Sequence, residues 1–186
     1  MKIVPIFVSA NVDDGLWSIH LSGEAKNEFD NFFDLLNDIE WLYNFFIQNR
    51  LDLNSGYFGN ISVKTAISRT LDEAQQMENL LYDLSEKGFA SNSINLQSVF
   101  RPLNNFEYAI VTHQKSKARV RRGWLRLYAI RLAENCYLVT GGAIKLTFDM
   151  RRGHLQLELN KLEQAKRFLC ANGIDYPEDL NTYNNE

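Results

Sequence analysis

The 186 residues are 45% hydrophobic and 12% aromatic, which excludes an intrinsically disordered chain and suffices for one sizeable core. The net charge of -3 conceals an inversion, because residues 1–100 carry 6 Lys and Arg against 14 Asp and Glu, whereas residues 101–154 carry 11 against 3. No apolar stretch approaches the roughly 20 residues that span a bilayer. The N-terminal sequence lacks the small-residue cleavage end of a signal peptide, so we expect a cytoplasmic protein without membrane partners.

The N-terminal part of the chain predicts a hairpin followed by a helical region. Residues 2–8 and 16–21 are β-rich and are separated by turn-forming residues 11–15, which favours a β-hairpin. From residue 24 to 50 apolar residues recur every three or four positions, which predicts amphipathic helix with a break near Asn37. These apolar residues are Phe29, Phe32, Phe33, Leu36, Ile39, Leu42, Tyr43, Phe46 and Ile47. We interpret them as core, and a partner-binding face is the alternative.

A long helix is predicted after the glycine-containing loop at residues 54–60. Ser62 is a favourable N-cap, and the helix runs to about Lys87 because Gly88 can end it. Residues 89–105 show no periodic pattern. Pro102 excludes a central strand there, because proline cannot donate a hydrogen bond to a neighbouring strand.

The last third of the chain is rich in β-forming residues. Strands are predicted at residues 108–112, 124–132 and 136–147, with the short connection at 133–135 forming a hairpin. Such short connections favour antiparallel pairing, so we predict an antiparallel meander.

Apolar spacing predicts a closing helix from Leu155 that ends at Gly173, and the tail from Asp175 has no core pattern. The fold class is therefore predicted to be α+β, with an antiparallel β-sheet packed by helices. The N-terminal β-hairpin and helical extension are expected to dock on the same body.

Residues 115–131 form the densest basic part of the chain, with no acid between Glu107 and Glu134. Cations beside aromatic rings suit single-stranded RNA, because the cations release counterions and unstacked bases can stack on the rings. The interleaved rings are Tyr108, His113, Trp124 and Tyr128. The candidate RNA-binding cations are Lys115, Lys117, Arg119, Arg121 and Arg122. An exposed strand edge kept soluble by Lys and Arg is the alternative.

Several motifs with known chemistry are absent. The chain has no GxxxxGK[ST], GxGxxG, HExxH, paired CxxC or GxSxG, so nucleotide hydrolysis, zinc hydrolysis and α/β-hydrolase chemistry lack support, and we expect no cofactor or metal. Cys136 and Cys170 are too few and too far apart for a disulfide framework, and we expect buried free thiols. His20 alternates with apolar residues and is interpreted as structural. For His113 and His154, in or beside the basic region, both a solvent-exposed and a catalytic role stay open.

Alternation along the strand predicted at residues 124–132 places Arg126 and Tyr128 on one face. The same face carries Trp124 and Ile130, and the opposite face carries Leu125, Leu127, Ala129 and Arg131. Lys145 projects from the next strand, just after Gly141 and Gly142, where a ligand or a backbone could approach closely, with a β-bulge as the alternative. Arginine, lysine and tyrosine can stabilise a pentavalent phosphate and move protons in RNA cleavage by the 2′-hydroxyl. Arg126, Tyr128 and Lys145 are therefore the candidate catalytic residues.

The order of elements, and the stretch LRLYAIRLAENCYLVTGGAIKLTFDMRRGHLQLELNKLEQAKRFL, resemble the RelE/HigB-like superfamily of bacterial toxin–antitoxin ribonucleases. The resemblance covers about residues 62–172. In many HigB-like members a strand with valine, leucine and glycine, then a lysine pair and threonine, leads through a polar loop into the last helix. The matching residues are Val139, Gly142, Lys145 and Thr147, and Leu146 replaces the second lysine.

The resemblance implies a messenger-RNA endonuclease, ribosome-associated or free, that is neutralised by an antitoxin encoded alongside it, often with a helix-turn-helix domain. It assigns the catalytic role to Arg126, Tyr128 and Lys145 and adds Arg151 and Arg152 as RNA-binding residues.

The same resemblance divides the chain into a hairpin and helix-pair extension at residues 1–61, a RelE/HigB-like core at 62–174 and a flexible tail at 175–186. Two other functions stay open. The chain could be a catalytically silent module of this fold that holds RNA or an acidic protein. Alternatively, the acidic helices of residues 1–100 could mask the basic sheet and regulate it.

Overall fold

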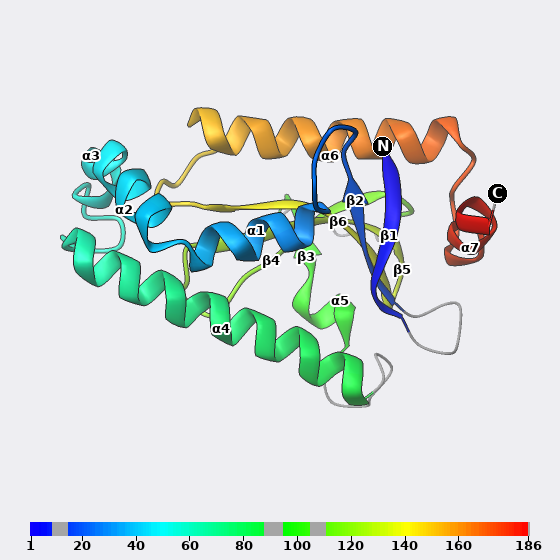
Figure 1. The fold of residues 1–186 in the computed structure, drawn as a ribbon, viewed down its shortest axis with the longest axis horizontal. Coiled ribbons are helices and arrows are strands. Elements are labelled where there is room, and N and C mark those ends of the chain that lie inside the picture. Colours follow the sequence, from blue (N-terminus) through cyan, green and yellow to red (C-terminus); the bar gives the residue numbers. More distant parts are fainter. Residues whose placement is uncertain (9–14, 88–94, 105–110, 186) are drawn as a thin grey trace.

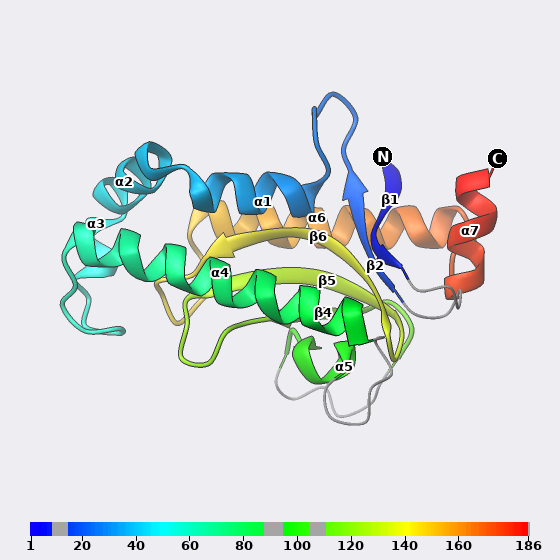
Figure 2. The ribbon, with the colours of Figure 1, turned by 60° about the horizontal axis from the view of Figure 1, so that its bottom comes forward.

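A six-stranded β-sheet with helices on both faces organises the computed structural model, which describes residues 1–8, 15–87, 95–104 and 111–185 (Figures 1 and 2). The strands are β1 (Lys2–Val8), β2 (Gly15–His20), β3 (Arg101–Pro102), β4 (Gln114–Ala118), β5 (Leu125–Ala133) and β6 (Cys136–Ile144). The helices are α1 (Glu28–Asn37), α2 (Ile39–Gln48), α3 (Arg50–Leu53), α4 (Val63–Lys87), α5 (Leu96–Val99), α6 (Gly153–Ala171) and α7 (Pro177–Asn185). The predicted α+β class is confirmed. None of these helices, all from the described ranges, has the length and apolar composition of a membrane span.

The sheet is mixed, and the prediction of a purely antiparallel sheet was wrong. Its strand order is β1-β2-β6-β5-β4-β3. β1 and β2 form the predicted hairpin, but β2 also runs parallel to β6, with Gly15 opposite Cys136 and Ser18 opposite Val139. A parallel pair needs a crossover connection, and here the connection is the whole chain between the two strands. Local patterning carries no information on pairing across such a separation.

Strand β4 lies in the basic part of the chain, between the strands predicted at residues 108–112 and 124–132. Its buried side chains are Gln114, Ser116 and Ala118, and Lys115 and Lys117 alternate with them. Because this inward face has no large apolar residue, the hydrophobic pattern that identifies a strand is missing.

Two further predictions concern the segment before β4. Residues 108–110 of the predicted strand at 108–112 lie outside the described residues, and Val111 and Thr112 are not in a strand. Pro102 lies in β3 at the edge of the sheet, which agrees with the exclusion of a central strand there.

Helices α1, α2 and α4 cover one face of the sheet, and α6 lies on the opposite face (Figure 1). Phe32 of α1 and Phe46 of α2 share the first core with Met77 of α4 and with Leu127 and Val139 of the sheet. The core interpretation of the aromatic stripe is confirmed for Phe29, Phe32, Phe33, Leu36, Leu42 and Phe46. It is wrong for Ile39, Tyr43 and Ile47, which are exposed on α2.

The second core lies between the sheet and α6. Leu155 and Leu162 of α6 belong to it, together with Ile130 of β5. Ile174, just before the predicted tail, and Leu180, within it, are buried in the same core, so part of the tail from Asp175 belongs to the folded body although its sequence has no core pattern. α7 buries too few apolar residues to produce a periodic pattern, which is why the sequence does not reveal it.

The predicted helix boundaries have local causes in the sequence. The break near Asn37 falls at Asp38, whose side chain accepts a hydrogen bond from the backbone N–H of Trp41 at 2.9 Å and so starts α2. Ser62 accepts from the N–H of Thr65 at 3.2 Å at the start of α4. Gly173 follows α6 with a φ of 64°, a conformation that glycine adopts without strain.

A β-bulge lies directly before Gly141 and Gly142, because Gly141 pairs with Tyr128 whereas Val139 pairs with Ala129, which leaves Thr140 as the extra residue. A Cβ added to Gly142 would lie 2.6 Å from the Phe32 ring, and one added to Gly141 would lie 2.1 Å from Oε2 of Glu158. The glycines therefore admit one side chain from each helical layer, and the close approach that the sequence suggests is made by protein atoms.

The two helical layers are also joined by charge. Lys161 of α6 forms ion pairs with Glu28 of α1 and with Glu158 one turn before it. Both carboxylates are buried, with side chains 7% and 8% exposed. Such a cluster needs full pairing to offset the cost of removing its charges from water.

Candidate functional site

A cavity of about 430 Å³ lies against the face of the sheet that α6 covers, within the size range of ligand pockets. Its lining comes from β3, β4, β5 and α6, from the loop after β6 and from the α3–α4 loop. We call it the basic cavity. Its cationic lining residues are Arg101, Lys117, Arg119, Arg126 and Lys145.

Strand pairing explains why these cations meet. Alternation along β5 points Arg126 and Tyr128 to the α6 side, as predicted, and the register places Lys117 of β4 opposite Tyr128. Lys145 follows β6, and its backbone N–H donates to the carbonyl of Trp124, which fixes it beside the start of β5. The prediction for Trp124 itself was wrong, because it precedes β5 and is buried in the opposite core.

The basic cavity is an electropositive site without a compensating acid among its described lining residues. Five cations line it, and no Asp or Glu does. Arg119, Arg126 and Lys145 form no ion pair within the described part of the chain. Arg126 is only 7% exposed, so its charge is held in a poorly solvated position. A bound anion would stabilise this arrangement.

Backbone carbonyls hold the buried cations in place. Nη1 of Arg126 donates to the carbonyls of Gly123 at 2.9 Å and Leu125 at 2.7 Å. Nζ of Lys145 donates to the carbonyls of Thr147 at 2.8 Å and Phe148 at 2.6 Å. These contacts orient the side chains without neutralising them, because a carbonyl carries no net charge.

Burial and mutual repulsion alter the acidity of the cations. The pKa of Lys145 is lowered by desolvation and then by Arg126 and Lys117. The pKa of Lys117 is lowered by desolvation and then by Arg126 and Arg119. Arg126 has a lowered pKa from desolvation and from Arg119, yet a guanidinium stays protonated in proteins. At a given pH a larger fraction of each of these lysines is therefore neutral than of an ordinary lysine, and only the neutral amine can accept a proton.

Tyr128 behaves in the opposite way. Desolvation raises its pKa above the usual value for tyrosine, although Arg126 partly opposes this effect. Its hydroxyl lies 3.7 Å from Sδ of Met150. The side chain therefore stays a phenol at neutral pH, which makes it a hydrogen-bond donor and not a base.

Not all predicted RNA-binding residues reach the basic cavity. Lys117 and Arg119 line it, whereas Lys115 pairs with Glu163 of α6. Arg121 and Arg122 line a separate groove against α4, which also contains carboxylates.

The two predicted arginines of the loop before α6 also lie outside the basic cavity. Arg152 pairs with Asp52 of α3, and the side chain of Arg151 is 87% exposed beside Asp149. The candidate catalytic residues Arg126, Tyr128 and Lys145, by contrast, all line one cavity.

Comparisons with known proteins give no relative. No protein-family model, no curated protein and no solved structure matches the chain. The RelE/HigB-like resemblance therefore stays a prediction, and the site must be judged on its own geometry.

The aromatic residues at the basic cavity differ from those that the sequence suggests. His113, Trp124 and Tyr128 are buried, and Tyr108 lies outside the described residues. The exposed rings are Tyr57 and Phe148, which line the basic cavity together with Arg101 and Asn104. These residues sit in loops and at a sheet edge, where no periodic pattern marks them. The one signal in the sequence was the position of Phe148, three residues after Lys145 and next to Asp149 in a polar segment.

Neither candidate histidine belongs to the site. Nε2 of His113 donates to the carbonyl of Ile174 at 2.7 Å in the second core, and Nε2 of His154 donates to the carbonyl of Ile144 at 3.0 Å. Both are structural, and neither is solvent-exposed. His20 likewise donates to a backbone carbonyl, that of Glu24, in agreement with its structural interpretation.

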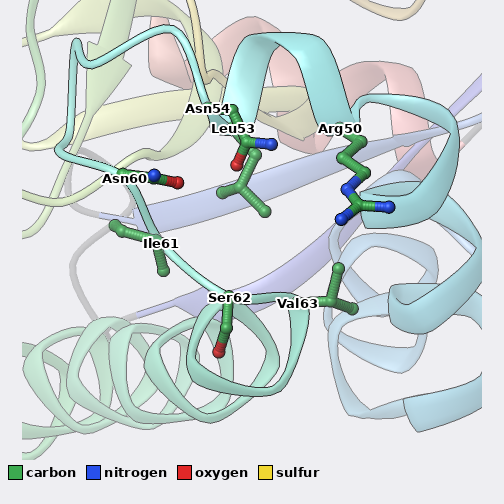
Figure 3. Close-up of a pocket in the computed structure, with 7 residues that line it drawn as sticks. All are labelled: Arg50, Leu53, Asn54, Asn60, Ile61, Ser62 and Val63. Carbon is green, nitrogen blue, oxygen red and sulfur yellow. The ribbon is translucent and has the colours of Figure 1, made fainter.

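A second cavity, shown in Figure 3, lies between α3 and the start of α4. It measures about 470 Å³, and Arg50 is the charged residue among those that line it. Asn54, Asn60 and Ser62 supply its other polar groups. One arginine beside neutral side chains provides no acid–base pair, so this cavity is a weaker candidate than the basic cavity.

The donor set favours an anion and not a cation. In the described ranges no three His, Cys, Asp or Glu side chains gather as metal ligands. Cys136 is buried, as predicted, but Cys170 is exposed. Fixed arginines, two lysines with lowered pKa values and a phenol donor can bind a phosphate, accept a proton and donate a hydrogen bond to a developing negative charge.

Proposed function

We propose that this chain is a cytoplasmic RNA-binding toxin of the RelE/HigB-like type, and that it cleaves messenger RNA in the basic cavity without a metal. The observation that carries the proposal is the meeting of Arg126, Tyr128 and Lys145 with Lys117 and Arg119 around one cavity without an acid among its described lining residues. Phosphodiester groups match such a site, because each carries one negative charge and several acceptor oxygens.

The chemistry follows from the protonation states of the side chains. The 2′-hydroxyl of the substrate attacks the adjacent phosphorus, the neutral form of Lys145, which its lowered pKa makes more abundant, accepts the hydroxyl proton, and the bond from phosphorus to the 5′-oxygen breaks. Arg126 stabilises the extra charge of the pentavalent phosphorane. Tyr128, which stays a phenol, donates a hydrogen bond to the departing 5′-oxygen. This oxygen then takes a proton either from the Tyr128 hydroxyl or from water. The products are a 2′,3′-cyclic phosphate and a 5′-hydroxyl.

A partner belongs to the proposal. An antitoxin with a helix-turn-helix domain, encoded beside this chain, would cover the basic cavity, and complementary charge would favour a partner segment rich in acids. RNA that is bound to the ribosome is a second form of the substrate.

A catalytically silent RNA-binding module is the second candidate. Lys145 donates to two backbone carbonyls, and the Tyr128 hydroxyl contacts Met150, so both groups already have protein partners. Proton transfer would require these contacts to open, whereas phosphate binding would not.

Binding and cleavage can be tested with single-stranded RNA. We expect binding that weakens steeply with salt, and the pair of substitutions Lys117→Ala and Arg119→Ala should lower the slope of log K against log salt by about 0.7 for each phosphate that is no longer neutralised. Lys145→Ala should reduce cleavage by about 10²- to 10⁴-fold, with 2′,3′-cyclic ends disappearing. Arg151→Ala, on an exposed side chain outside the cavity, is the matched control.

The outcomes separate the two candidates. Growth arrest on expression of the chain alone, relieved by the neighbouring reading frame, supports the toxin. Salt-dependent binding without new RNA ends supports the silent module. Binding that is insensitive to salt and to both cavity substitutions would remove the basic cavity from any role in RNA recognition.

A further inference from the structure

We propose that Tyr57 and Phe148 form a nucleobase platform at the mouth of the basic cavity, so that the site binds a base and its phosphate together. This inference rests on the proposed RNA-binding function and adds the part of the substrate that the cations do not contact. Both rings line the same cavity as Arg126 and Lys145. They come from loops that are distant in sequence, and they form an edge contact with ring centroids 6.4 Å apart and planes at 74°.

The exposure of these rings is the first argument. Phe148 is 85% exposed and Tyr57 is 53% exposed, so most of the Phe148 ring and about half of Tyr57 are in contact with water. A phenylalanine in this state adds little to folding, since the free energy of burying its apolar surface is not realised. Large rings with open faces beside a charged pocket are typical of ligand contacts.

The loops that carry the rings are held in position, which is the second argument. The carbonyl of Phe148 accepts a hydrogen bond from Nζ of Lys145 at 2.6 Å, so this part of the platform is tied directly to a cavity cation. Tyr57 packs edge-on against Phe58, with centroids 4.7 Å apart, and Phe58 in turn packs on Trp124 of the core. Rings with fixed loops and open faces lose little conformational freedom when a base stacks on them.

The charge of the site selects among ligands with a flat apolar face. A neutral lipid or an apolar peptide would supply no counter-charge for Arg119, Arg126 and Lys145, which form no ion pair with the described residues. A nucleotide unit of single-stranded RNA satisfies both halves of the site, because its phosphate meets the cations and its base meets the rings. Stacking of bases on aromatic side chains tolerates any sequence, because every base has a π-face.

The test compares three probes on the full chain: a short single-stranded RNA, an abasic ribose-phosphate oligomer of the same length, and the mononucleotide AMP. Tyr57→Ala and Phe148→Ala should each weaken RNA binding by about 5- to 150-fold, the range measured for loss of one stacked base. The same substitutions should leave the abasic oligomer unaffected. Phe148→Trp, in contrast to Phe148→Ala, should keep the RNA affinity of the unmodified chain, because the tryptophan ring can still stack on a base. AMP binding that also depends on the rings would indicate that a single nucleotide fills the site.

Tyr43→Ala is the matched control, because Tyr43 is a 52% exposed tyrosine on α2 and does not line the basic cavity. Equal binding of RNA and the abasic oligomer to the unmodified chain would overturn the platform and leave the cationic site standing. RNA binding that neither Tyr57→Ala nor Phe148→Ala changes would likewise overturn the platform and leave the cationic site standing. Failure of the unmodified chain to bind any RNA would overturn the proposed function, and the platform with it.

Discussion

At the scale of single residues, the most unusual group is Glu158, whose buried carboxyl is only half satisfied. Its Oε1 pairs with Lys161 at 2.9 Å, whereas Oε2, above Gly141, has no hydrogen-bond partner in the described structure. Desolvation raises the pKa of Glu158 to about 7, with Lys161 opposing the shift and Glu28 of α1 adding to it. Tyr128 of β5 also faces it, and Glu158 helps to raise the pKa of Tyr128.

This carboxyl should make the stability of the protein depend on pH. The folded chain keeps the proton up to about pH 7, whereas the unfolded chain loses it near 4.5, so the folded state binds more protons between these values. The free energy of unfolding should therefore fall as pH rises through this window, by up to ~1.4 kcal/mol per pH unit. Glu158→Gln should remove that decrease, as measured by urea unfolding between about pH 5 and pH 8.

Glu163→Gln is the control for this measurement. Glu163 has a lowered pKa because of its hydrogen bond with Lys115, so its own titration falls below the window. The control should follow the pH profile of the unmodified protein. If the Glu158→Gln profile does so as well, Glu158 is not the group that titrates.

At the scale of elements, one carboxylate of α4 binds the backbone at the start of β5. Oε2 of Glu73 accepts hydrogen bonds from the backbone N–H groups of Trp124 at 2.8 Å and Leu125 at 3.1 Å, and Oε1 accepts from Arg69. Arg69 in turn lies over the Trp124 ring, 4.2 Å from its centre. α4 thereby caps the strand that carries Arg126.

Removing this cap should destabilise the protein strongly. Glu73→Ala leaves two buried N–H donors without a partner, and we expect the free energy of unfolding to fall by about 2–5 kcal/mol. Asp72→Ala, on the exposed neighbour in the same helix, should cost less than ~1 kcal/mol. Chemical denaturation measures both. Equal effects of the two substitutions would show that the capping interaction adds nothing.

The elements that the sequence predicts are those whose signals are local. α1, α4 and α6 have apolar periodicity and recognisable caps at Asp38, Ser62 and Gly173. β4 and α7 were missed because their buried residues are small, polar or too few to form a pattern. The parallel pair of β2 and β6 was missed because strand pairing at long range has no local signal.

The candidate site was predictable to the extent that it depends on strands. Alternation along β5 correctly placed Arg126 and Tyr128 together, and Lys145 joins them from the position directly after β6. Tyr57 and Arg101 come from a loop and an edge strand that only the tertiary fold brings to the cavity. Lys115, Arg121 and Arg152 show the converse, because a basic stretch does not reveal which cations are paired or point elsewhere.

At the scale of the whole molecule, the first 61 residues share the sheet and the first core with the rest. β2 lies beside β6, and Phe32 and Phe46 are buried in the core that contains Leu127. We expect a fragment of residues 62–186 not to fold alone, because it loses strands β1 and β2 and the aromatic residues that α1 and α2 contribute to the first core. A fragment of residues 1–175 should keep a cooperative thermal transition at a lower temperature, since it loses Leu180 but retains both layers.

Calorimetry or circular dichroism measures whether each of the two fragments has a cooperative thermal transition. A cooperative transition in residues 62–186 would show that the N-terminal part is a separable extension. Limited proteolysis of the full chain offers the same choice, since a stable product cut near Asn60 would contradict a shared core.

The parallel pair of β2 and β6 also sets the order of events during synthesis. Ser18 of β2 and Val139 of β6 are 121 positions apart. At about 5–20 residues per second, β2 and the apolar helices behind it leave the ribosome roughly 6–24 s before their partner strand exists. The nascent hairpin of β1 and β2 therefore lacks its inner neighbour over this interval, and the sheet can close only after Ile144, the last residue of β6, has been made.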